Sequence, residues 1–394
     1  MADIAAAAPV GASIRWRTIG LAVLIIAILV AALAIVAGTQ RPKVPAPFGP
    51  ARNGLIVYPT GGDIYALDPR TGETTALVKG DSNDLDPLFS PDGTRLAFDR
   101  LSSGQNVVST NVMVADTTGA HPVAVTPHPI AADGERFEWA ADSRSIYVQT
   151  AEHEIWLLDA TTPGQPRVLA TNAELVRSAA RPPDGRQLLI RQTQGSWHQL
   201  VVLDPATGDK RVIAEGGEDF LQSARWSTSG RQVAYTAPGT GDLTGVRLWI
   251  VDADGTNRHQ VTNAPGTWAD LDLAWSPDDR FIAFNRYQRT STNPDVWDVR
   301  PIGLLDVATG SVTSVGPLPR DVRGANPTEH DSNARRGEGF GFEWSPDGRT
   351  ILAVPSEATG HAIVIDPFAN TWKVVGPLFD EQGGASQEWQ RQLP

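Results

Sequence analysis

Aspartate is the residue type whose spacing in this chain could most readily do chemistry. Paired carboxylates can transfer protons, and the segment D-A-D-G-T-N at 252–257 could form half of a calcium loop. Seven aspartates each end a short apolar segment: Asp68, Asp116, Asp159, Asp204, Asp252, Asp306 and Asp366. The calcium-loop glutamate is absent, and the segment matches its six siblings. We therefore interpret all seven as turn residues.

Other residue types give no reactive pattern. The seven histidines are scattered without ligand spacing, and the chain has no cysteine, which excludes thiol catalysis and thiolate metal sites. No G-x-S-x-G, P-loop or G-x-G-x-x-G motif occurs. The sequence thus predicts no catalytic residues, no cofactor and no metal site, although distant loop residues could still assemble one around a central channel.

A phrase that recurs along the chain predicts β-hairpins. Its fullest form is F-E-W-S-P-D-G-R-T-I-L-A-V at 342–354. Proline sets the backbone for a tight turn, Ser and Asp side chains bond nearby N–H groups, and glycine takes the left-handed position. Asp279 and Ser143 replace that glycine in two copies. An alternating apolar strand follows each turn.

Each hairpin phrase is followed by a second one, a strand that ends in aspartate and a D-x-x-T-G turn. The residues four before the turn glycine are Phe89, Trp139, Arg181, Trp226, Trp275 and Trp344. Most intervals between them are close to the ~40–45 residues of a four-stranded propeller blade. We interpret the tryptophans as wedges between adjacent blades. The sequence therefore predicts an all-β protein, a β-propeller.

The first D-x-x-T-G turn, at Asp68, has no hairpin phrase before it. Trp389, near the C terminus, lies in phase with the repeat. A C-terminal strand through Trp389 would supply the missing strand of the first blade and remove an open sheet edge. We expect seven blades closed in this way, and six blades is the alternative.

The repeat resembles the TolB-type, WD-like β-propeller repeat over about residues 53–394. The resemblance rests on the W-S-P-D-G…A-F and V-D-x-x-T-G pairing, which is specific for fold and uninformative for activity. TolB has six blades and a separate α/β domain and works in the periplasm through protein contacts. No separate α/β domain is predicted here, so a TolB role in envelope division does not follow.

The N-terminal region predicts a membrane anchor. Residues 19–38 are uncharged and predominantly apolar, and a helix of that length spans about 30 Å. A cleaved signal peptide usually has a shorter apolar core and is the alternative. We expect a tail at 1–18, a transmembrane signal anchor at 19–38, a Pro-rich linker at 39–53 and the propeller at 54–394. The propeller is expected outside the cytoplasm, in a bacterial periplasm or at the cell surface.

Irregular loops point to a docking corner. Net charge −12 argues against nucleic acid as a partner. The turns S-P-D-G and D-x-x-T-G should share one face, here called the first face, while long loops at 287–300 and 317–341 should lie on the opposite, second face. Their aromatic, basic and acidic residues suit a protein contact. The candidate partner-binding residues are Trp297, Asp298, Arg300, Glu329, His330, Asp331, Arg335 and Arg336.

These features favour a protein-binding or assembly module over an enzyme, possibly as an accessory subunit of a membrane complex. The expected partners are membrane or envelope proteins. Two alternatives remain: a sensor that binds a small molecule or glycan, and a metal-dependent propeller enzyme similar to lactonases or lyases. A bound metal in the channel would favour the enzyme, and co-purification with a membrane complex would favour the assembly role.

Overall fold

The computed structural model describes residues 51–103, 108–132, 136–176, 187–217, 220, 223–239, 242–263, 268–289, 297–299, 302–316, 340–355, 360–379 and 388–392. Every regular element within these ranges is a β-strand. No helix in them is long and apolar enough to cross a membrane. The predicted membrane helix at 19–38 lies outside the described residues.

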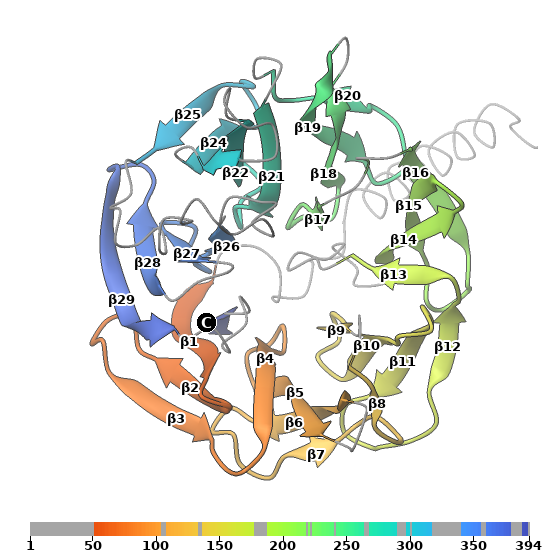
Figure 1. Cartoon of the computed structure of the whole chain (residues 1–394), viewed down its shortest axis with the longest axis vertical. Helices are drawn as coiled ribbons and strands as arrows, with labels where there is room; N and C mark the ends of the chain where they lie inside the picture. Colours follow the sequence, from red (N-terminus) through yellow and green to blue (C-terminus); the bar gives the residue numbers. More distant parts are fainter. Residues whose placement is uncertain are drawn as a thin grey trace, which may run out of the picture. The chain divides into compact units, whose positions relative to one another are not determined.

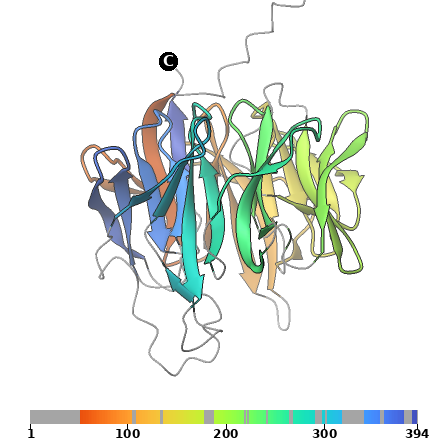
Figure 2. The same cartoon turned by 90° about the horizontal axis from the view of Figure 1, so that it is seen from above.

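The strands form six hydrogen-bonded sheets that stand side by side around a ring (Figures 1 and 2). From the inside outwards, the sheet at the ends of the chain contains β30 (Glu388–Gln392), β1 (Arg52–Thr60), β2 (Asp63–Leu67) and β3 (Thr74–Val78). The next contains β4 (Asn83–Phe89), β5 (Arg95–Ser103), β6 (Val108–Asp116) and β7 (Val123–Ala124), with β8 (Ile130–Ala131) against β6. The third contains β9 (Arg136–Trp139), β10 (Ser145–Gln149), β11 (Ile155–Asp159) and β12 (Arg167–Ala170).

The remaining sheets continue the same order. The fourth contains β13 (Ala173–Leu175), β14 (Leu188–Gln194), β15 (Trp197–Leu203) and β16 (Lys210–Gly216). A nine-stranded sheet contains β17 (Ala224–Trp226), β18 (Gln232–Gly239), β19 (Asp242–Asp252), β20 (His259–Gln260), β21 (Trp268–Trp275), β22 (Phe281–Arg289), β23 (Trp297–Val299), β24 (Ile302–Asp306) and β25 (Val312–Val315). The last contains β26 (Phe340–Trp344), β27 (Ile351–Pro355), β28 (Gly360–Asp366) and β29 (Thr371–Phe379).

The prediction of an all-β propeller is confirmed, but seven separate sheets do not appear. Five separate sheets have the size of one blade, and the sixth has nine strands. The larger sheet arises because β19 and β21 pair in parallel at one point, Val246 opposite Ala269. A long-range pairing of this kind leaves no local pattern in the sequence.

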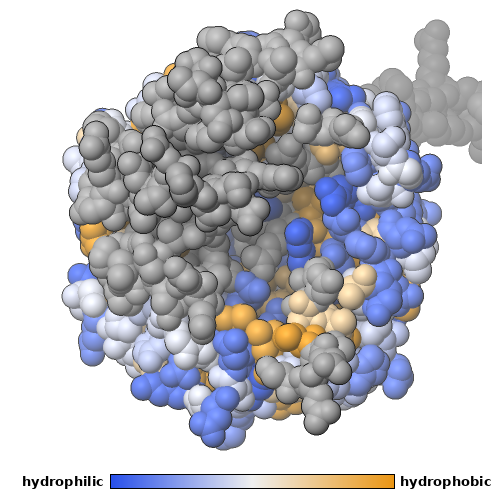
Figure 3. All heavy atoms as spheres, in the orientation of Figure 1, coloured by the Kyte–Doolittle hydropathy of each residue, from blue (hydrophilic) through white to orange (hydrophobic). Residues whose placement is uncertain are grey.

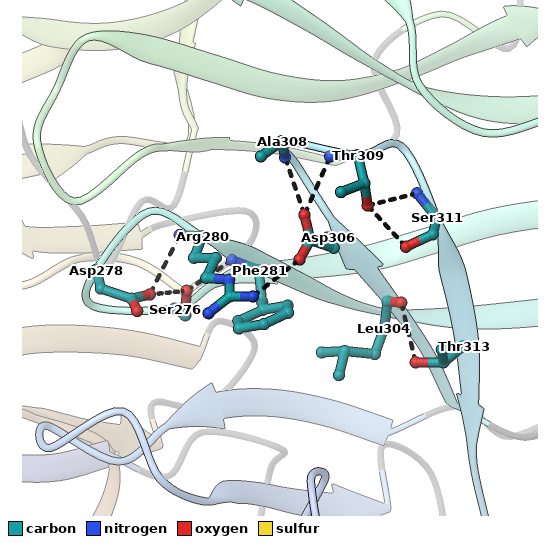
Figure 4. Close-up of polar contacts among 10 residues, drawn as sticks. All are labelled: Ser276, Asp278, Arg280, Phe281, Leu304, Asp306, Ala308, Thr309, Ser311 and Thr313. Carbon is teal, nitrogen blue, oxygen red and sulfur yellow. Dashed lines mark hydrogen bonds and ion pairs between the residues drawn. The ribbon is translucent and has the colours of Figure 1, made fainter.

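Turn chemistry explains the repeated phrases, as predicted. In the copy shown in Figure 4, the Ser276 hydroxyl donates to Asp278 at 2.6 Å, and the backbone N–H of Arg280 donates to the same carboxylate at 3.1 Å. The carboxylate of Asp306 accepts the backbone N–H of Thr309 at 3.1 Å. Arg280 and Asp306 pair at 3.4 Å, so the two turn types meet on the first face.

The positions expected to need a left-handed backbone have one. Gly93 and Gly348 both have φ of 71°. Ser143 and Asp279, which replace the turn glycine, have φ of 56° and 60°. The hairpin phrase therefore keeps its geometry even where glycine is lost, at the strain cost of a non-glycine residue in this region.

Tryptophans wedge neighbouring sheets together, as predicted. Trp139 and Trp226 are at most 1% exposed. Three indole N–H groups donate to a carbonyl of the preceding innermost strand: Trp139 to Leu88 (3.0 Å), Trp275 to Arg225 (3.2 Å) and Trp344 to Ala274 (3.1 Å). Each wedge thus adds a directional bond to the burial of its ring.

The C-terminal strand closes the ring, which confirms that prediction. β30 pairs antiparallel with β1, with Trp389 opposite Ile56. The Trp389 side chain is 3% exposed and packs in the cluster that joins this sheet to the last one. Gly93 also contributes, because a Cβ there would collide with the carbonyl of Arg391. The two ends of the propeller are therefore locked together by one strand.

Candidate functional site

Two glutamates lie where the ring closes, on the innermost strands. Both carboxylate oxygens of Glu343, in β26, accept the backbone N–H of Trp389 in β30, at 3.0 Å each. The carboxylate of Glu388, in β30, accepts the backbone N–H of Phe89 in β4. Each glutamate thus reaches from its own strand to the innermost strand of the next sheet.

The period of a β-strand accounts for this placement. Successive side chains point to opposite faces of a strand. Trp344 therefore packs toward the preceding sheet, where its indole reaches Ala274, while Glu343 points toward the following sheet and reaches Trp389. The dipeptide Glu-Trp fixes both contacts at once.

The surroundings of this pair shift the pKa of Glu343. Burial raises the pKa of Glu343 well above its usual value, and the negative charge of Glu388 raises it further, against the opposing bond from the Trp389 N–H. Burial lowers the pKa of Arg391, and the charge of Glu388 counteracts that shift. The raised pKa favours the protonated form of Glu343 beside the Glu388 carboxyl group. One carboxyl can then donate a proton while the other accepts one.

The turn aspartates are unsuited to proton donation. The Thr118 hydroxyl and backbone lower the pKa of Asp116, and the backbone N–H of Thr309 lowers that of Asp306. Both groups are therefore ionised acceptors that hold turns. Their interpretation as turn residues is confirmed.

Sequence reasoning missed the glutamate pair, although a signal for it exists. Glu-Trp recurs at 138–139, 343–344 and 388–389, always at the aligned tryptophan. The repeat of the acid could have indicated an inner-strand role. What the sequence does not contain is the adjacency of β26, β30 and β4, which follows only from closure.

The structure places two residues of the predicted docking corner. Trp297 and Asp298 lie in β23, whose backbone pairs with β22: Arg289 opposite Trp297 and Gln288 opposite Asp298. The six others lie outside the described residues: Arg300, Glu329, His330, Asp331, Arg335 and Arg336. Whether all eight form one surface therefore stays a prediction.

Metal-binding side chains are not clustered in the described part of the chain. Within the ranges that the structure describes, no group of three or more His, Asp or Glu side chains lies close enough together to hold a metal ion. In the coloured part of the face seen in Figure 3, hydrophilic side chains dominate the right and lower rim, and hydrophobic ones gather nearer the centre.

Comparison with known proteins gives enzymes as relatives. No family model matches the chain. The chain is 27% identical over 107 residues to oligogalacturonate lyase from Dickeya dadantii (strain 3937). The aligned region covers 27% of this chain and 27% of that protein. The matched part thus spans about a quarter of the length of that curated relative.

Solved structures extend the likeness over most of the propeller. An oligogalacturonate lyase from Vibrio parahaemolyticus matches with a TM-score of 0.55 and 14% identity, covering 82% of this chain and 86% of that chain. TolB from Acinetobacter baumannii matches with a TM-score of 0.49 and 16% identity, covering 87% and 81%. At these identities a solved structure shows the fold alone.

These relatives correct one expectation from the sequence. We expected a binding module that is not an enzyme, and the curated relative is a lyase. The prediction failed because it relied on local motifs, whereas a propeller assembles its reactive groups from distant strands. Glu343 shows how distant strands meet, since its carboxylate accepts the backbone N–H of Trp389, 46 residues further along the chain.

Proposed function

We propose that this chain is a propeller enzyme that cleaves an oligosaccharide by elimination, with Glu343 and Glu388 as its acid and base. The observation that carries the proposal is the pair itself, two carboxyls on adjacent innermost strands with the pKa of Glu343 raised by burial and by its neighbour. Pairs of titratable groups whose environments separate their pKa values mark acid and base roles. The lyase relative supplies the reaction class.

The chemistry balances without a further reagent. Glu388, ionised, takes the proton from the carbon next to a uronate carboxylate, and the electron pair forms a carbon–carbon double bond. The bond from the neighbouring carbon to the glycosidic oxygen breaks, and Glu343 gives its proton to that oxygen. The charge of Glu388 opposes the lowering of the Arg391 pKa by burial, so the two groups interact electrostatically.

The test measures the new double bond by its ultraviolet absorbance, with oligogalacturonate as the substrate. We expect Glu343→Gln and Glu388→Gln each to reduce the rate by about a hundredfold or more, as for removal of a general acid or base. Glu215→Gln, on the exposed outer strand β16, is the matched control and should retain the wild-type rate. A folded wild-type protein that forms no unsaturated product from this substrate would show that the proposal is wrong.

The membrane anchor and the outward location remain part of the proposal. Residues 19–38 are long and apolar enough to span a bilayer, and a large domain follows them. Protease added to intact spheroplasts should digest the propeller. Full protection until lysis would place the domain inside the cytoplasm.

Seven blades is the arrangement that we propose for the ring. The segments β17 to β20 and β21 to β25 each carry their own hairpin phrase and their own aspartate turn. This supports a division of the nine-stranded sheet into two blades that share the single pair between Val246 and Ala269.

A docking role at the second face is a second candidate and is compatible with an enzyme. The supporting observation is that β23 prolongs the β22 ladder and carries Trp297 and Asp298 at its start. A partner would be an envelope protein. Replacing Trp297, Arg335 and Arg336 with alanine should abolish co-purification of that partner without a change in thermal unfolding. Unchanged recovery of the same partners would place docking elsewhere.

A further inference from the structure

The aspartate turn between β28 and β29 carries an aromatic residue that its siblings lack. It reads D-P-F-A-N. The matching turns of three other sheets read D-P-R-T-G, D-P-A-T-G and D-V-A-T-G, at 68–72, 204–208 and 306–310. The carboxylate of Asp366 accepts the backbone N–H groups of Phe368 at 2.9 Å and Ala369 at 2.8 Å. The turn is therefore held by its aspartate, and the ring of Phe368 is not needed for it.

A second exposed aromatic follows in β29. Trp372 lies opposite Ile365, in the second residue pair after the turn. The residues at this register position in the three sibling sheets are Thr74, Lys210 and Val312. Phe368, Trp372 and Val374 are 57%, 39% and 45% exposed. Of these four sheets, the last one thus gathers large apolar side chains at its turn.

These three side chains lie on one side of their sheet. Trp372 and Val374 lie opposite two isoleucines of β28 that pack in the core against β22 and β24. The ring of Phe368 lies 5.3 Å from that of Phe281 in β22 and 6.4 Å from that of Trp344, centre to centre. All three therefore face the neighbouring sheet at the outer rim of the first face. We call Phe368, Trp372 and Val374 the β29 patch.

The chain enters the propeller at the first face of the same sheet. The backbone N–H of Ala51 donates to the carbonyl of Pro346 at 2.7 Å, in the turn between β26 and β27. The Asn53 side chain accepts the backbone N–H of Asp347 in that turn, at 3.0 Å. The residues that precede Ala51 therefore start from the first face, at the sheet that carries the β29 patch.

The length of the preceding segment limits how far a bilayer can lie from this face. Residues 39–50 separate Ala51 from the apolar segment 19–38. A segment of this length reaches at most about 40 Å when fully extended. Where 19–38 spans a bilayer, as proposed above, the bilayer surface lies within that distance of Ala51.

We propose that the β29 patch rests on the headgroup region of this bilayer, with Phe368 and Trp372 at the boundary between headgroups and acyl chains. The proposal rests on the membrane anchor of the proposed function. Aromatic rings favour this boundary. Lys373, within β29, and Arg280, whose guanidinium lies 4.8 Å from the Phe281 ring centre, are both exposed beside the patch. Such cations accompany interfacial aromatics because they reach lipid phosphates.

A second copy of the chain fits the β29 patch less well than a bilayer does. A stable protein interface buries about 800 Å² on each partner. An aromatic side chain buries only about 150–250 Å² when it is fully covered. The patch has two partly exposed aromatics and one valine. It is therefore too small for a stable dimer, but it can support a surface to which the chain is already tethered.

Site-specific quenching tests the contact on the full chain in nanodiscs of zwitterionic phosphatidylcholine, which the net charge of −12 does not repel. The chain has no cysteine, so Phe368→Cys or Val374→Cys accepts one thiol-reactive fluorophore. We expect a nitroxide on the lipid headgroup to quench either label at least about twofold more than the controls. Ala206→Cys occupies the matching turn position in another sheet. Trp197→Cys replaces an exposed tryptophan in the β14–β15 hairpin, at the end of β15 opposite its aspartate turn.

The outcomes separate the patch from the anchor. Stronger quenching at 368 and 374 than at both controls, with unchanged thermal unfolding, supports the patch. Equal quenching at all four positions, or stronger quenching at 197, in discs that hold the protein overturns the patch and leaves the anchor standing. A label at 368 that is shielded from water but not quenched by the lipid shows that protein covers it and also overturns the proposal. A chain that does not co-elute with the discs refutes the anchor and the patch together, without bearing on the elimination by Glu343 and Glu388.

Discussion

Two junctions between neighbouring sheets are held by different chemistry. At the β19–β21 junction, backbone pairing joins Val246 to Ala269, and Arg247 donates to the carbonyl of Trp268 at 2.5 Å. At the closing junction, where β30 meets β26 and β4, the side-chain bonds come from Glu343 and Glu388. The first relies on carbonyl acceptors, whereas the second relies on groups that titrate.

The wedge tryptophans sharpen the contrast. At the β19–β21 junction the indole of Trp275 donates to the carbonyl of Arg225 at 3.2 Å. The indole nitrogen of Trp389, at the closing junction, is buried and has no hydrogen-bond partner among the described residues. An unmet buried donor costs about 1–3 kcal/mol. The wedge tryptophan of the closing junction therefore lacks the indole bond that Trp275 makes at the β19–β21 junction.

The largest expected effect comes from removing the closing strand. Deletion of residues 384–394 removes β30 and exposes the edge of β1. Loss of one buried tryptophan alone costs about 3–5 kcal/mol, and the deletion also removes the ladder with β1. We expect the cooperative thermal transition, followed by circular dichroism, to fall sharply or vanish. Deletion of 393–394 alone is the control, and unchanged melting of the longer deletion would contradict closure by β30.

A smaller loss should follow from Arg247→Ala at the β19–β21 junction. The guanidinium donates to the carbonyls of Val246 and Trp268, and the side chain is 2% exposed. Leaving partly buried carbonyls without this donor should cost about 1 kcal/mol in denaturant unfolding. Arg231→Ala, at an exposed turn, serves as the control.

The closing junction should depend on pH in a defined direction. The pKa of Glu343 is raised above its ordinary value of 4.5. Its contribution to stability is therefore fully present below about that pH and is lost as the pH rises through the folded-state value. Glu343→Gln mimics the protonated form. We expect the variant to exceed the wild type in stability at pH 8 and to approach it at pH 5.

That comparison removes the titration of Glu343 together with its electrostatic coupling to Glu388, whereas carboxyls far from this pair contribute equally in both proteins. A difference in unfolding free energy that stays constant between pH 5 and pH 8 would show that Glu343 does not titrate in this range. A difference that grows on acidification would reverse the sign and contradict the burial argument.

Local chemistry made much of the fold predictable. The Ser and Asp side chains and the left-handed glycine position identify the hairpins, and Trp389 identifies the closing strand through its phase in the repeat. The same local pattern assigned the wedge tryptophans correctly. The turns depend on residues that are close in sequence. The wedge tryptophans and the closing strand are recognised from the blade-length spacing of the repeat, which is kept even where single residues of the phrase differ.

The site residues depend on contacts that no period encodes. Glu343 finds Trp389 only because the ring closes, and Arg247 finds Trp268 only because β19 and β21 meet. The segment Asp-Leu-Asp occurs twice in the sequence, at 84–86 and 270–272. The β-bulge at each segment is recognised only from the register of the paired strands. Motif searches therefore underestimated the chemistry that this chain could do.

The smallest expected effect concerns a single turn at the β19–β21 junction. Asp279 takes the left-handed position with φ of 60°, and its carboxylate accepts the backbone N–H of Ser229 at 3.0 and 3.2 Å. Glycine would relieve about 1 kcal/mol of backbone strain but would lose a bond worth about 0.5–1.5 kcal/mol. Asp279→Gly should therefore remain within about 1 kcal/mol of the wild type.

Asp279→Asn separates the two terms, because asparagine tolerates the left-handed region and keeps an acceptor oxygen. Burial raises the pKa of Asp279, so an uncharged acceptor should be at least as stable as the wild type at pH 8. If Asp279→Asn instead loses more stability than Asp279→Gly, the carboxylate charge itself holds the turn. The β19–β21 junction would then depend on a titrating group after all, and the contrast with the closing junction would be one of degree.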